Sequence, residues 1–90
     1  MPWEVCIVGR VSAAKRVLDK RFDESNRGEV APQQEECRRL AKEIVKRELD
    51  AAEALGGDKY ITITAASVED QHGFPEIKMA IRLLPGFVTE

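Results

Sequence analysis

Residues 32–55, PQQEECRRLAKEIVKRELDAAEAL, form the longest periodic segment of this 90-residue chain and decide its fold. Pro32 suits the first turn of a helix, where its missing N–H costs nothing, and Gly56-Gly57 suit a left-handed helix end. At 100° per residue, one side of such a helix is apolar and the opposite side is charged. We therefore expect an amphipathic helix over residues 32–55, with an apolar stripe made of Cys37, Leu40, Ala41, Ile44, Val45, Ala51, Ala52 and Leu55.

Three other segments have the pattern of strands. Residues 3–11 and 60–65 alternate between apolar and polar side chains, as half-buried strands do. Residues 76–84 alternate again after a turn-forming cluster at 69–75. The second and third strands therefore form a hairpin.

A shorter helix and a loop separate the first strand from the long helix. Ser12 suits the N-cap of a helix over residues 13–23, and residues 24–31 form a polar loop. The order β-α-α-β-β predicts an α+β two-layer sandwich, with a three-stranded, mainly antiparallel sheet and two helices on one face. The first and third strands then run in the same direction, and the strand order stays open. We expect the uncovered sheet face to carry Thr62, Thr64, Lys78 and Arg82.

Length and composition limit the class of protein. At 90 residues we expect a single domain over 1–90, in which residues 84–90 form a tail that adds a short strand or lies free. The fractions of 33% charged and 43% hydrophobic residues are ordinary for a globular domain. A formal net charge of −2 disfavours a protein that binds mainly to nucleic-acid phosphates.

The location of the protein is predicted from what the sequence lacks. Its first residues show no basic segment followed by an apolar one, and no apolar run reaches roughly 18 residues. We therefore expect a soluble, cytoplasmic protein that does not bind membranes. Cys6 and Cys37 lack the spacing of metal ligands, so we expect both thiols to be reduced and mostly buried.

Glu48 interrupts the apolar stripe of the long helix. A helix of 24 residues spans roughly 36 Å, whereas strands of about eight residues span roughly 27 Å, so we expect part of the helix to overhang the sheet. Antiparallel packing of the helices would place Glu35 and Glu36 beside Arg21, and Glu48 near Lys15. Glu48 then either joins an exposed salt bridge or lines a cleft or a subunit contact.

The turn from the first strand into the short helix is a candidate anion site. Ser12, Lys15 and Arg16 lie at a helix N-terminus, where free N–H groups and the helix dipole favour an anion. No phosphate-binding glycine motif is present, and Glu48 would neutralise part of the charge. An ordinary capped helix is the alternative.

Catalysis is not predicted. His72 is the only histidine, and it lies among acidic residues in a turn that we expect to be solvated. No serine, threonine or cysteine can be assigned as a nucleophile beside it. We therefore expect no catalytic residue, no metal site and no cofactor.

Arg38, Lys42 and Lys46 recur every four residues and form a basic ridge on the long helix, with Arg39 beside them. The pairs Glu35–Arg39 and Glu43–Arg47 have the favourable i,i+4 order, so neighbouring carboxylates can neutralise the ridge. A nucleic-acid contact is the alternative. The element order also matches the start of the KH-type RNA-binding fold, but the loop at 26–29 lacks its G-x-x-G, so the match is one of topology.

These patterns favour a small non-enzymatic domain that binds a protein partner, or a second copy of itself, through the long helix, the open sheet face or an edge strand. The candidate interaction residues are Glu48, Arg38, Lys42 and Lys46. Two alternatives stay open: a nucleic-acid-associated accessory protein that uses the basic ridge, and a weak anion or nucleotide binder that uses Ser12, Lys15 and Arg16.

Overall fold

The elements follow the predicted order β-α-α-β-β. A computed structural model of the protein describes residues 3–25 and 31–84. The centre of the predicted polar loop, residues 26–30, and the predicted tail from residue 85 onward lie outside the described residues. The elements are β1 (Glu4–Arg10), α1 (Val11–Glu24), α2 (Pro32–Ala54), β2 (Tyr60–Glu69) and β3 (Pro75–Leu84).

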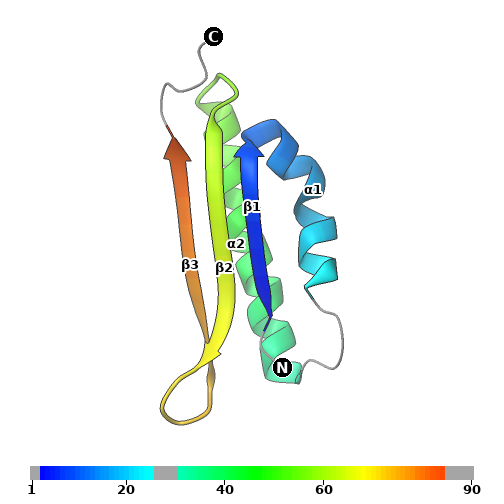
Figure 1. Ribbon diagram of the computed structural model, residues 1–90, viewed down its shortest axis with the longest axis vertical. Coiled ribbons are helices and arrows are strands. Elements are labelled where there is room, and N and C mark those ends of the chain that lie inside the picture. The colour runs from blue at the N-terminus through cyan, green and yellow to red at the C-terminus, as the bar shows by residue number, and fades with distance from the viewer. Residues whose placement is uncertain (1–2, 26–30, 85–90) are drawn as a thin grey trace.

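The three strands form an antiparallel sheet in the order β1-β2-β3, an order that the sequence pattern left open. Ile63 in β2 lies opposite Ile7 in β1 and Ile81 in β3. β1 and β3 therefore run in the same direction, as predicted, with β2 between them. Both helices lie on one face of this sheet (Figure 1), so the predicted α+β architecture is confirmed.

Alternation along the strands separates a covered face from an open one. On the covered face, Val5, Ile7, Ile61 and Ile63 are buried, and Ile81 is half-buried. The cross-strand pairs Thr62↔Arg82 and Ala66↔Lys78 lie on the other face, as predicted. Exposed side chains on that open face include Cys6, Val8, Thr64, Lys78 and Arg82.

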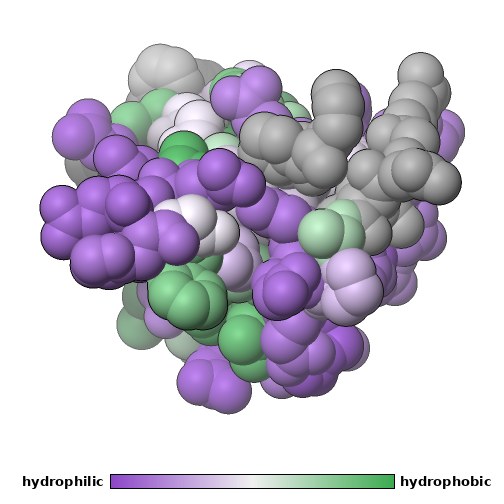
Figure 2. Space-filling model, turned by 90° about the horizontal axis from the view of Figure 1, so that it is seen from below, coloured by the Kyte–Doolittle hydropathy of each residue, from purple (hydrophilic) through white to green (hydrophobic). Residues whose placement is uncertain are grey.

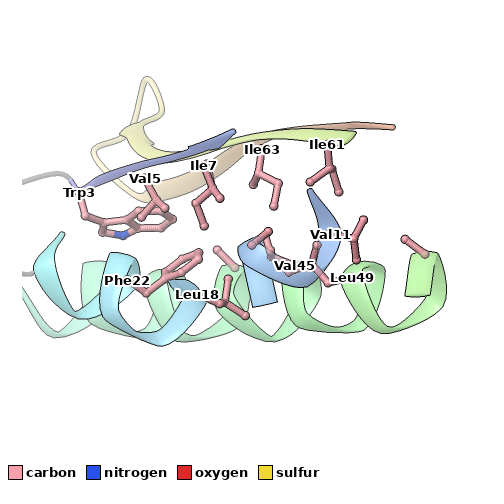
Figure 3. Packing of buried hydrophobic residues seen from close by; sticks show 14 residues of the cluster. Trp3, Val5, Ile7, Val11, Leu18, Phe22, Val45, Leu49, Ile61 and Ile63 are labelled. Atoms are coloured by element: carbon pink, nitrogen blue, oxygen red, sulfur yellow. The ribbon is translucent and has the colours of Figure 1, made fainter. Parts of the chain in front are cut away.

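Apolar side chains from both layers meet in one core between the sheet and the helices (Figure 3). The ring centroids of Trp3 and Phe22 lie 6.1 Å apart, with their planes tilted by 50°. The indole N–H of Trp3 donates a hydrogen bond of 2.9 Å to the backbone C=O of Gln34, so the polar atom of a buried ring is satisfied. Trp3 thereby connects the start of the sheet to both helices.

The ends of α2 lie close to where the sequence predicts them. Pro32 occupies the first turn, and the helix ends at Ala54, with Leu55 as its C-cap. Gly56 and Gly57 follow with φ values of 87° and 73°. Only glycine adopts such angles without strain, so these two residues stop the helix.

The buried side of α2 differs from the predicted stripe. Leu49 is fully buried, although the prediction omitted it, whereas Leu40 and Ile44 are 40% and 41% exposed and Leu55 is 71% exposed. The helical period gives the average direction of an apolar side, and the neighbouring elements decide which part of it is covered. The buried residues of α2 are Gln34, Ala41, Val45, Leu49 and Ala52.

Two expectations about lengths and neighbours were wrong. β2 and β3 each have 10 residues, about 34 Å, which nearly matches the roughly 35 Å of α2. The predicted overhang came from underestimating the length of the strands. Glu35 does not pair with Arg21, because its carboxylate binds Arg38 on the next turn of its own helix.

The cysteines also differ from expectation. Both are free thiols, but Cys6 is exposed and Cys37 is only half-buried. Cys6 alternates with Val5 and Ile7 along β1, so its side chain points to the open face of the sheet. Among the residues described, no helix combines the length and the apolar character needed to cross a membrane.

The observed orientation of α2 predicts which of its leucines supports the fold. Leu49→Ala should lower the free energy of unfolding by about 2–5 kcal/mol, because a buried cavity replaces the side chain. Urea denaturation at low protein concentration, followed by circular dichroism, measures this loss. The matched variant Leu55→Ala should cost less than about 0.5 kcal/mol. Equal losses in the two variants would contradict the assigned orientation.

Candidate interaction surface

A carboxylate from the loop before β2 engages the start of α1. The helix begins at Val11 with Arg10 as its N-cap, so the prediction that Ser12 is the N-cap is wrong. Asp58 instead accepts hydrogen bonds from the backbone N–H of Ser12 (3.1 Å) and from its hydroxyl (2.8 Å). Asp58 thus satisfies the helix end as a capping side chain would. The backbone bond and then the hydroxyl bond lower the pKa of Asp58, because both stabilise its ionised form.

The other two residues of the candidate anion site also lie near carboxylates of the chain. Lys15 Nζ lies 2.8 Å from Asp50 Oδ1 and 2.7 Å from Glu53 Oε1, which joins α1 to α2. These two hydrogen bonds raise the pKa of Lys15. Arg16 is exposed, and its charge contributes to the lowered pKa of Asp58. An external anion would have to compete here with three carboxylates.

The basic ridge of α2 is largely neutralised by its neighbours. Arg39 forms ion pairs with Glu36 and Glu43 on its own helix. Lys42 Nζ lies 3.0 Å from Asp19 Oδ1 of α1, and this hydrogen bond lowers the pKa of Asp19. Lys46 is exposed on the same side, where its charge contributes to that lowered pKa.

Arg38 contributes to the packing of the two helices. Its guanidinium donates hydrogen bonds to the carboxylate of Glu35 and, at 2.8 Å, to the C=O of Phe22 in the last turn of α1. The side chain is only 11% exposed. Arg38 therefore satisfies a helix-end carbonyl and fixes α1 against α2, and the observed pair Glu35–Arg38 replaces the predicted Glu35–Arg39.

Glu48 lies on a different side of α2 from the one predicted. It is exposed and does not pair with Lys15, whose partners Asp50 and Glu53 lie on another side of α2. Glu48 instead faces β3, where it lines a hollow of about 240 Å³ together with Leu55, Ile81 and Leu83. Glu48 thus lines a surface hollow, one of the two settings expected for it, but beside β3 and not beside Lys15.

This hollow is one end of a longer apolar surface, which we call the β3–α2 groove. Leu40 and Ile44 precede Glu48 at intervals of four residues, so they lie on the same side of α2. Figure 1 shows α1 beyond β1 and α2 behind the sheet, and no helix of the described chain lies beyond β3. Viewed along the long axis from the hairpin end, apolar groups reach the surface between polar ones (Figure 2). We use this name for the residues that line the hollow together with the exposed or half-buried apolar residues that continue it along the same sides of α2 and β3, which are Leu40, Ile44, Glu48, Ala51 and Leu55 of α2 and Ile77, Met79, Ile81 and Leu83 of β3.

No strand of residues 3–25 and 31–84 pairs with the outer side of β3. Ser67 N–H bonds Trp3 C=O, and Val11 N–H bonds Lys59 C=O, so odd-numbered residues of β2 point their backbone groups toward β1. The even-numbered residues must then bond β3, because these directions alternate in antiparallel sheets. Between Ile77 and Leu83, every second residue therefore directs both its N–H and its C=O to the open edge of the sheet. The residues concerned are Ile77, Met79, Ile81 and Leu83, whose side chains also line the groove.

The hairpin turn uses its acidic groups for its own structure. Asp70 Oδ1 accepts hydrogen bonds from the backbone N–H groups of His72 (2.8 Å) and Phe74 (2.9 Å). His72 is exposed. Within residues 3–25 and 31–84, no three His, Cys, Asp or Glu side chains gather as a metal site would require.

The sequence analysis includes an edge strand among the possible interaction surfaces, but it does not identify β3 as that strand or predict the groove beside it. A usable signal was present: Ile77, Met79, Ile81 and Leu83 repeat with period two, which indicates an apolar strand face that requires a cover. Comparisons with protein-family models, curated protein sequences and solved structures give no match. Function is therefore inferred from the residues and their geometry.

The Ser12–Asp58 contact predicts a pH-dependent stability. Because the pKa of folded Asp58 is lowered, its ionised form stabilises the fold above the ordinary pKa of 3.8, and this contribution disappears as the pH falls through the lowered value. Wild type should therefore unfold at a higher urea concentration than Asp58→Asn at pH 7, and the two midpoints should converge as the pH falls below about 4.

Glu69→Gln is the matched control for this measurement, because it removes the charge of an exposed carboxylate at the end of β2. Its urea midpoint should stay close to that of wild type at pH 7. A loss in Glu69→Gln as large as that in Asp58→Asn would show that overall charge, and not the capping contact, causes the effect.

Proposed function

We propose that this protein is a small non-enzymatic interaction domain that binds a protein partner along the edge of β3 and in the β3–α2 groove. The observation that carries this proposal is the coincidence of two unsatisfied features on one strand. Within the described residues, no strand pairs with the outer backbone groups of β3, and α2 covers the apolar face beside them only in part. Each feature is an established basis of protein recognition.

The two features favour a partner that adds an extended strand to the sheet. Such a strand would bond the N–H and C=O groups of Ile77 to Leu83, and every second side chain would point to the helix-covered side. Apolar side chains at those positions would pack against Ile44 and Leu83, which are 41% and 39% exposed. The main-chain bonds would supply part of the affinity, and the groove would supply selectivity.

The charge distribution supports a protein partner over a nucleic acid. Arg38, Arg39 and Lys42 are engaged by carboxylates of the chain itself. Binding to phosphates would have to break these contacts or rely on the remaining cations, in a chain whose formal net charge is −2. The groove, in contrast, exposes apolar side chains, among them Leu40 and Ile44, which carry no ion pair that binding would have to break.

The test compares two matched substitutions on opposite faces. Ile44→Arg places a charge in the groove, and Val8→Arg places the same charge on the open sheet face, where Val8 is 61% exposed. Tagged wild type and both variants are used to capture proteins from an extract that also contains the untagged chain. Each captured protein is identified by mass spectrometry, purified, and titrated against all three baits by calorimetry.

Val8→Arg should bind the purified partner as wild type does, and Ile44→Arg should bind it at least about tenfold more weakly, because a charge in an apolar contact is costly. Equal binding by all three proteins would refute the proposal. So would oligonucleotide binding that weakens between about 50 and 200 mM salt and is lost in Lys42→Glu, because it would identify nucleic acid as the ligand.

A further inference from the structure

On the basis of the proposed function, we infer that the partner at the β3 edge is a second copy of this chain, bound as a two-fold dimer in which the two β3 strands pair antiparallel about Met79. The two sheets would then form one continuous six-stranded sheet with all four helices on the same face. An interface of this kind is isologous, because each copy offers the same strand to the other.

Backbone geometry limits the registers that such a dimer can use. The groups of Ile77, Met79, Ile81 and Leu83 point outward, so these residues must bond one another across the interface. A two-fold axis through Met79 pairs Met79 with itself and Ile77 with Ile81 of the partner subunit. Pro75, which has no N–H, lies at the end of this ladder, where its C=O can still accept a hydrogen bond from Leu83 of the partner subunit.

Among the registers centred on Lys78, Met79 and Ala80, the charges on the open face of β3 favour the one centred on Met79. In it, Glu76 lies directly opposite Arg82 of the partner subunit, and symmetry repeats the pair. Lys78 then faces Ala80 of the partner subunit. Moving the axis to Ala80 would place Lys78 opposite Arg82 of the partner subunit, and moving it to Lys78 would place two lysines together. Like charges directly opposite each other destabilise strand pairing.

The same register closes the groove. Ile77, Met79 and Ile81 are half-buried on the helix side, and their counterparts from the partner subunit would extend this apolar row across the axis. β3 runs in the same direction as α2 (Figure 1), and Leu83 lies beside the 51–55 turn of α2. Going back from Leu83 to Met79 covers about 14 Å, which equals about nine residues of helix and leads to Ile44. Exposed Ile44 is therefore level with the axis.

The edge of β1 does not offer the same surface. Its inner side chains Val5 and Ile7 are only 3% and 4% exposed, because α1 covers them. Arg21 and Glu24 of α1 line a depression beside Glu4, so helix residues border this edge. Pairing at β1 would thus cover little apolar surface, whereas pairing at β3 covers surface that one copy alone leaves half-exposed.

The experiment measures the mass of the full chain by size-exclusion chromatography with light scattering at protein concentrations from about 10 µM to 1 mM. Wild type should change with concentration from 10.1 kDa toward twice that mass. Glu76→Arg and Arg82→Glu should each weaken the association about tenfold, because both symmetric pairs become repulsive. An equimolar mixture of the two variants should associate again, since each chain then supplies the charges that the other lacks.

Recovery in the mixture shows that both variants are folded and that residues 76 and 82 face each other between copies. Glu4→Arg makes the same charge reversal at the β1 edge and should leave the dimer intact. The inference is overturned if wild type keeps the mass of a monomer throughout, if charge reversal at Glu76 and Arg82 has no effect, or if Glu4→Arg dissociates the dimer.

Failure of this inference and failure of the proposed function give different results. A monomer that still binds another protein in a manner sensitive to Ile44→Arg would refute the second copy as partner and leave the interaction domain in place. If Ile44→Arg has no effect in the capture and titration experiments, the proposed function itself is refuted.

Discussion

The junction between β1 and α1 fixes the arrangement of the helical layer. β1 ends at Arg10 and α1 begins at Val11. Because no linker separates them, the end of β1 determines where α1 starts relative to the sheet. The Val11 N–H continues the ladder to Lys59 C=O at 2.9 Å, and the next residue, Ser12, binds Asp58. The first turn of α1 is thus bound to the residues just before β2, and from there α1 runs back along the outer side of β1 (Figure 1).

The position of α2 follows from that of α1. Lys15 bonds Asp50 and Glu53 near one end of the helix pair, and Arg38 bonds the C=O of Phe22 near the other. α1 lies over β1, whereas α2, held against α1 at both ends, lies over β2 and β3. The side of α2 that faces away from α1 and the outer part of β3 therefore have no further helix of the described chain to cover them.

Sequence reasoning succeeds where the cause is local. The alternation of Trp3, Val5 and Ile7, and the proline and glycines at the ends of α2, suffice to predict the elements and their order, because neighbouring residues determine these features. The full length of β2 could not be predicted from residues 66–69, because the alanine, serine and glutamate there give little alternation. Pairing with β3 extends the strand to Glu69. The hairpin partner, not the local sequence, sets that boundary.

The surroundings of the candidate site residues could not be predicted, because they depend on contacts between residues far apart in the sequence. Asp58 reaches Ser12 from 46 residues away, and Lys15 binds Asp50 and Glu53 instead of the expected Glu48, because the buried side of α2 is rotated from the predicted apolar stripe. The same rotation buries Leu49 and exposes Ile44. A helical period predicts that an apolar side exists, but its direction is decided by the elements that pack around it.

The pairing of β1 with β2 has a consequence for how the chain reaches this structure. Both helices, residues 11–59, form the connection between two antiparallel neighbours, whereas β2 and β3 are joined by a short turn. The entropy lost in closing such a connection grows only logarithmically with its length, and it is reduced when the intervening chain is already helical and compact. Trp3, which contacts Phe22 in α1 and Gln34 in α2, holds both helices of this long connection against the start of β1, so the only tryptophan of the chain stabilises the closed connection.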